Sequence, residues 1–139
     1  MIYVKAVIKG EDDTPPFIRL FEYPDESDEL IFFNSIKMIK EKLSKNLKIN
    51  INECLMVYCA YIIEELHANK SINSIEENAA KVLSVNQVMI GVPESLRKIT
   101  FEVKLDNDND NDNDNNSQKH IVKISEPIPI SKYILAKDS

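Results

Sequence analysis

The sequence predicts an α+β fold: three to four helices followed by an antiparallel β-hairpin, with a β-rich N-terminal extension. Three observations lead to this class. Apolar residues recur every three or four positions across residues 51–66, which is helical spacing. Apolar and polar residues alternate in residues 99–105 and 121–125, which is strand spacing. Two stretches within residues 1–24 are rich in β-branched and aromatic side chains, which favour strands.

A chain of 139 residues is long enough for one domain with a core and too short for two domains of ordinary size. We therefore expect one domain with extensions. The N-terminal extension covers residues 1–24, the main domain covers 25–130 with an Asp/Asn-rich loop at 106–116, and a C-terminal tail covers 131–139.

Residues 3–9 and 17–23 are the expected strands of the extension. The connection at residues 10–16 is long and Pro-rich for a tight hairpin, so the sequence leaves two arrangements open. The strands pair with each other, or they add to another sheet.

A first helix is expected after Pro24, with Asp25 or Ser27 as its N-cap and Asn46 as its end. Acidic residues fill the first turn and lysines gather toward the end, as the helix dipole favours. The expected inner face consists of Phe32, Ile36, Ile39 and Leu43.

The central helix is expected between Asn50 and Asn69, where Asn69 suits a left-handed stop. Asn50 and Glu53 have the spacing of a capping box. Residues 54–63 contain no charge, and apolar side chains point in every direction around the helix. This helix should be buried on several sides, and in so small a body we expect the surface of a partner to complete its burial.

Shorter elements follow the central helix. Ser71 or Ser74 should begin a third helix, and the capping-box spacing of Ser84 and Gln87 predicts a short fourth helix that Gly91 ends. Residues 92–96 read as a turn or a single helical turn, which leads into the hairpin strands at 99–105 and 121–125.

The formal charge of −6 is concentrated in the five Asp residues of the 106–116 run, and the rest of the chain carries only −1. The charge therefore predicts neither nucleic acid nor an anionic membrane as a partner. The acidic third helix also argues against a winged-helix DNA-binding protein. No secretory signal is visible, so we expect a cytoplasmic protein. The Asp/Asn run lacks the Gly and Glu of a calcium loop and predicts a solvated insertion.

No catalytic residue and no metal ligand is expected on this chain. His67 and His120 have no ligand-spaced neighbour, and no phosphate-binding or nucleophile motif occurs. Cys54 and Cys59 are interpreted as small buried hydrophobes in a reducing compartment. The residues alone thus indicate a small α+β module without an active site of its own.

Several segments resemble the gamma subunit of urease. Residues 47–54, Leu-Lys-Ile-Asn-Ile-Asn-Glu-Cys, are similar to that family's Leu-Lys-Leu-Asn-Tyr-x-Glu-Ala, and residues 88–94, Val-Met-Ile-Gly-Val-Pro-Glu, are similar to its Val-Met-x-Gly-Val-Pro-Glu. The Ile-Thr-Phe-Glu stretch at 99–102 then leads into a hairpin that ends on Pro127-Ile128. The resemblance covers about residues 25–128. It departs from the family in the added N-terminal residues, in the Asp/Asn insertion and at Ser125, which stands where the family has His.

The resemblance implies a hydrolase complex that converts urea to ammonia and carbamate at a two-nickel site held by the alpha subunit. The gamma subunit contributes no ligand; it packs beside the alpha and beta subunits in a threefold-symmetric complex. The alternative is a gamma-like adaptor or homo-oligomeric module outside urease. The candidate site residues, with a structural or a subunit-interface role, are Asn50, Glu53, Val88, Met89, Gly91, Val92 and Pro93.

Overall fold

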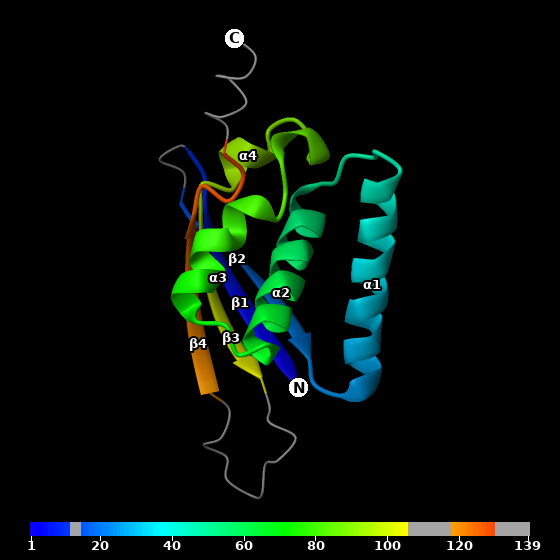
Figure 1. Ribbon diagram of the computed structural model, residues 1–139, viewed down its shortest axis with the longest axis vertical. Helices are drawn as coiled ribbons and strands as arrows, with labels where there is room; N and C mark the ends of the chain where they lie inside the picture. The colour runs from blue at the N-terminus through cyan, green and yellow to red at the C-terminus, as the bar shows by residue number, and fades with distance from the viewer. Residues whose placement is uncertain (12–14, 106–117, 130–139) are drawn as a thin grey trace, which may run out of the picture.

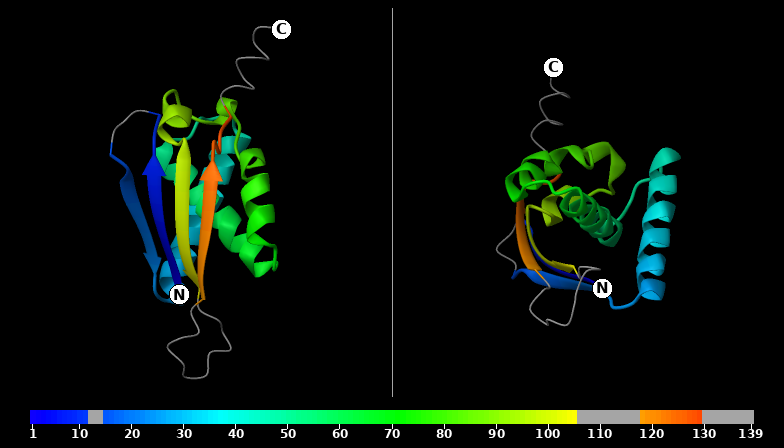
Figure 2. Two further views of the ribbon diagram at one scale, coloured as in Figure 1. Left: turned by 90° about the vertical axis from the view of Figure 1, so that its left-hand side faces the viewer. Right: turned by 60° about the horizontal axis from the view of Figure 1, so that its bottom comes forward.

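The computed structural model describes residues 1–11, 15–105 and 118–129 and shows two layers, a four-stranded antiparallel sheet and a set of helices packed on one of its faces (Figures 1 and 2). The strand order is β2-β1-β3-β4. The predicted α+β class with its N-terminal strands and C-terminal hairpin is confirmed. The Asp/Asn loop at 106–116 and the tail at 131–139 lie outside the described residues.

The N-terminal strands are part of the main sheet. Strand β1 (Ile2–Lys9) pairs with β2 (Phe17–Tyr23) on one side and with β3 (Lys98–Leu105) on the other. Both arrangements that the sequence left open therefore occur together. The alternating side chains of β1 that face the helices are buried: Ile2, Val4, Ala6 and Ile8.

Strands β3 and β4 (Gln118–Ser125) form the predicted hairpin, in which Leu105 is paired with Gln118. Ile99, Phe101 and Val103 of β3 face the helices and are buried, because the period-two alternation places every second side chain on one face. The opposite face of the sheet carries no helix among the described elements (Figure 2, left).

Helix α1 (Glu26–Ser44) begins at Asp25, whose carboxylate accepts the Asp28 N–H at 3.0 Å. Asn46 follows the helix with a φ of 62°, which is the left-handed conformation that ends helices. Three residues of the predicted inner face are buried, and Leu43 is half-buried.

Helix α2 (Ile51–His67) lies between α1 and the sheet (Figures 1 and 2). Its predicted capping box is present, and Asn69 follows it with a φ of 60°. The prediction that a partner completes its burial is wrong for this helix. The chain's own sheet and helices cover it, because β1 and β2 widen the sheet beyond the predicted hairpin. Its buried residues are Cys54, Leu55, Val57, Tyr58, Cys59, Ala60, Ile62 and Ile63.

The segment after α2 differs from the prediction in two respects. Helix α3 (Ile72–Asn78) begins at Ser71, and a 3-10 turn at Ala79–Lys81 extends it. The predicted fourth helix is only a 3-10 turn at Val85–Gln87, because Val88 becomes extended where it bridges to Ile49. Gly91 then begins the single-turn helix α4 (Val92–Ser95) instead of ending a helix.

None of the helices in the described part of the chain is both long enough and apolar enough to cross a membrane.

Candidate functional site

The two sequence motifs that suggested a site lie side by side in the structure. The Ile49 N–H donates to the Gln87 carbonyl at 3.0 Å, and the Met89 N–H donates to the Ile49 carbonyl at 2.9 Å. These two bonds form a parallel bridge between Ile49 and Val88. The Lys48 ammonium adds a third link through the Asn86 carbonyl at 2.7 Å. The start of α2 and the 88–93 turn thus form one corner of the molecule.

Asn50 and Glu53 hold this corner in place. The Asn50 side chain accepts the Glu53 N–H at 2.9 Å, and the Glu53 carboxylate accepts the Asn50 N–H at 3.0 Å. The same carboxylate pairs with the Lys42 ammonium of α1 at 2.7 Å. Desolvation acts to raise the pKa of Glu53, but the hydrogen bonds from Lys42 and the Asn50 N–H outweigh it and hold this pKa below its ordinary value. Both residues have a structural role: they start α2 and tie it to α1.

Four further candidates have environments that fit a structural role. Val88, Val92 and Pro93 are buried in the core. Gly91 has a φ of +91°, and a Cβ placed there would meet no atom within 4 Å. The glycine is therefore required by the backbone conformation and not by a close neighbour.

Met89 is the one apolar candidate whose side chain is exposed, at 46%. Two neighbours that the sequence did not single out are exposed with it: Ile90 at 104% and Leu47 at 53%, on the two segments that the bridge joins. We call Leu47, Met89 and Ile90 the apolar corner. A sequence signal for Ile90 did exist, because three successive apolar residues before a left-handed glycine cannot all face the core.

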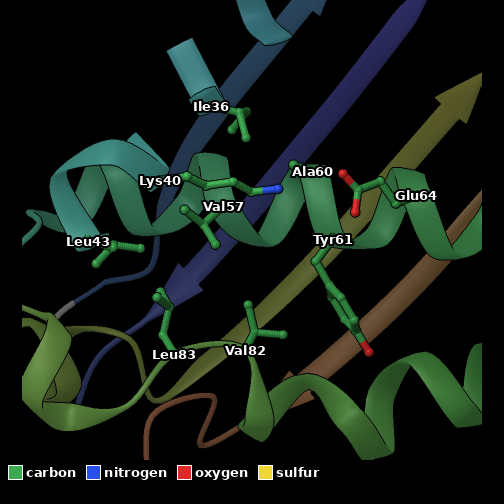
Figure 3. A pocket seen from close by; sticks show the side chains of 9 residues that line it. All are labelled: Ile36, Lys40, Leu43, Val57, Ala60, Tyr61, Glu64, Val82 and Leu83. Carbon is green, nitrogen blue, oxygen red and sulfur yellow. The ribbon is translucent and has the colours of Figure 1, made fainter. Parts of the chain in front are cut away.

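A groove of about 310 Å³ lies between α1, α2 and the segment after α3 (Figure 3). The side chains of Lys40 and Glu64 point toward one another across it. The Tyr61 hydroxyl is already engaged, because it donates to the Ile75 carbonyl at 2.7 Å. The other lining residues are Ile36, Leu43, Val57, Ala60, Val82 and Leu83. The groove can accept an apolar side chain and offers no arranged nucleophile and base.

Metal-binding and thiol chemistry find no support in the described residues. No group of three His, Cys, Asp or Glu side chains gathers there in an arrangement that would hold a metal ion. Cys54 and Cys59 are buried and unbonded, as predicted. Burial raises the pKa of the Cys54 thiol to about 12 and raises that of Cys59 as well, so both thiols stay protonated at neutral pH.

Comparison with known proteins agrees with the motifs at this corner. The family model described as "Urease, gamma subunit" matches residues 20–111. The urease subunit gamma of Halalkalibacterium halodurans is 32% identical over 79 residues, which cover 57% of this chain and 79% of that protein. The urease subunit gamma of Prochlorococcus marinus is 29% identical over 79 residues, with the same coverage. The chain belongs to the urease gamma subunit family.

Proposed function

We propose that this chain is a non-catalytic structural subunit of a urease, the complex that hydrolyses urea to ammonia and carbamate. It packs against a nickel-bearing alpha subunit and a beta subunit in a cytoplasmic hetero-oligomer with threefold symmetry. The observation that carries this proposal is the apolar corner, which is exposed and lies within the stretch that matches the family.

The corner has the make-up of a protein interface. Its three apolar side chains project into solvent, and two polar contacts, Lys48–Asn86 and Lys42–Glu53, belong to the same corner. An apolar centre with a polar rim is typical of interfaces between subunits. Burying a fully exposed Ile side chain contributes about 1.5–3 kcal/mol, so Ile90 alone would contribute substantially to the free energy of association.

A second apolar surface suits a second neighbour. Leu30, Ile31 and Met38 lie on the side of α1 that is turned away from the core, and all three are exposed. A subunit that contacts two other chains needs two such surfaces, and the apolar corner and this face of α1 provide them.

Nickel belongs to the alpha subunit in this proposal. The part of this chain that the structure describes holds no cluster of ligating side chains that fits a nickel ion. The role of this chain is therefore to stabilise the assembly that carries the metal.

The test is co-expression with candidate alpha and beta chains, followed by co-purification and a urea hydrolysis assay. Ile90→Asp should abolish co-purification and urea hydrolysis without lowering the melting temperature of the chain. Ile121→Asp is the matched control, because Ile121 is exposed on the helix-free face of the sheet. Normal assembly of Ile90→Asp, or equal loss in both variants, would contradict the proposal.

The alternative is a gamma-like adaptor that acts outside urease. The observation that favours it is the position of β1, which lies outside the family match and yet sits inside the sheet. Failure of the wild-type chain to co-purify with alpha and beta chains from the same genome would support this alternative.

A further inference from the structure

Strand β2 is an open edge of the sheet. It pairs with β1 on one side, and no described element lies along its other side (Figure 2, left). Two of its outward-facing side chains are apolar and exposed, Ile18 at 50% and Leu20 at 55%. A strand edge carries unpaired N–H and C=O groups, and an exposed edge with apolar side chains is a template for a further strand.

The opposite edge is closed. Helix α3 lies beside β4, and the Glu76 carboxylate of α3 accepts the Lys123 N–H of that strand at 2.8 Å. One edge can therefore add a strand and the other cannot. A sheet with a single open edge forms a closed pair with a second copy of itself, whereas two open edges would allow a fibre.

We propose that two copies of this chain associate through β2, antiparallel about a twofold axis at Leu20, so that the two sheets become one continuous sheet. This inference does not rest on the proposed function, because β2 carries none of the residues assigned to contacts with other urease chains.

Charge excludes two registers of β2, and the length of the strand favours the axis at Leu20. Arg19 is the one basic residue of the strand and Glu22 the one acidic residue. An axis at Arg19 would place two guanidinium groups opposite each other, and an axis at Glu22 would do the same with two carboxylates; like charges directly opposite destabilise a strand pair. An axis at Leu20 pairs all seven residues without any like-charged pair.

The cross-strand pairs of the Leu20 register are favourable on both faces. On the outer face Leu20 meets its own copy, and Ile18 lies opposite Glu22. On the helix-facing side Arg19 lies opposite Phe21, and Phe17 lies opposite Tyr23. The Arg19 guanidinium already lies over the Phe17 ring at 5.2 Å, so a contact with a second ring extends an existing cation–π arrangement. The backbone adds about six to eight hydrogen bonds over seven paired residues.

Cysteine cross-linking of the full chain tests the register. In Leu20→Cys the two new thiols lie directly opposite, with Cβ atoms about 4.5–5.5 Å apart, and should form a covalent dimer under mild oxidation. In the control Ile18→Cys the two thiols lie four residues apart along the strands, about 14 Å, and should not cross-link. The native thiols are buried and do not compete. No cross-link in Leu20→Cys, or equal cross-linking in both variants, would overturn the proposal.

Light scattering of the purified chain tests the interface itself. The wild type should show a concentration-dependent dimer, and Leu20→Lys should be a monomer with an unchanged melting temperature. Ile121→Lys, on the same face but beside the closed edge, should dimerise like the wild type. A monomeric wild type, or a dimer that survives Leu20→Lys, would overturn the proposal. Neither readout depends on whether the chain joins a urease.

Discussion

Replacing Ile8 by Ala tests whether the N-terminal strand is part of the core. Ile8 lies on β1 between Phe17 of β2 and Ile99 of β3, and its side chain is 0% exposed. The substitution removes three buried carbon atoms. At about 0.8 kcal/mol each, their transfer to water costs roughly 2–3 kcal/mol, and the cavity left behind raises the loss of stability to about 3–4 kcal/mol.

The assay is urea denaturation followed by circular dichroism. The slope of the unfolding free energy against urea concentration is compared between variants, because a changed slope would indicate a change in compactness and not only in stability. For a domain of this size the melting temperature should fall by about 10 °C. Ile121→Ala is the matched control, because Ile121 is 40% exposed on the outer face of β4 and should lose less than about 1 kcal/mol.

A loss of stability in Ile8→Ala no larger than that in Ile121→Ala would refute this reasoning. It would mean that β1 is an appended strand whose removal the rest of the domain tolerates. A large loss with an unchanged urea slope is the expected result.

Two further outcomes follow from buried polar groups on α2. Tyr58→Phe should reduce the free energy of unfolding by about 1–2 kcal/mol in urea denaturation. The reason is that the buried Tyr58 hydroxyl donates to the Pro127 carbonyl at 3.2 Å, and the substitution leaves that carbonyl unpaired. An unchanged free energy of unfolding would contradict this. Stability should also fall at alkaline pH, because burial raises the pKa of the Cys54 thiol from its ordinary value of 9.0 to about 12. Because the pKa of the Cys54 thiol is higher in the folded state than in the unfolded state, the buried protonated thiol favours folding. This stabilisation is fully present below pH 9 and is lost as the pH rises toward 12, at about 1 kcal/mol per pH unit. Cys54→Ala should make the decline in urea denaturation between pH 9 and 11 less steep, and an equally steep decline in that variant would argue against this origin.

The local parts of the fold could be predicted from the sequence. The caps at Asp25, Asn50 and Ser71 each bond to a residue three positions later, so both partners of each hydrogen bond lie in one short segment of the sequence. The strands were predictable for the same reason, because alternation reports which side of a strand is buried even when its neighbour is unknown.

The parts that depend on distant partners were not predictable. The pairing of Ile8 with Ile99 joins residues far apart in the chain, and the sequence of neither strand indicates which strand it pairs with. The expectation that α2 needs a partner surface is wrong for the same reason, because the local sequence does not reveal that β1 and β2 extend the sheet that covers this helix. The predicted fourth helix failed similarly, since the bridge from Ile49 makes Val88 extended where local spacing favoured a helix.

The candidate site shows the same division. The sequence singled out Asn50, Glu53 and the 88–93 turn separately, and the structure places them together in one corner. It could not distinguish buried from exposed members. The side chains of Val88 and Met89 are neighbours in the chain, yet the first is buried under the Ile49 bridge and the second faces solvent. Only the bridge geometry decides which of them is available to a partner.

The position of β1 limits how any other chain can bind. Without β1, the edge of β3 would be open and a strand from a partner could add to it. Here β1 fills that edge from within the same chain, and α3 closes the edge of β4. Among the described strands, β2 therefore keeps the open edge for strand addition, while the apolar corner offers a surface for contacts through side chains. Because these two surfaces use different chemistry on different elements, we expect the proposed self-association and the proposed assembly with other subunits to be independent of each other.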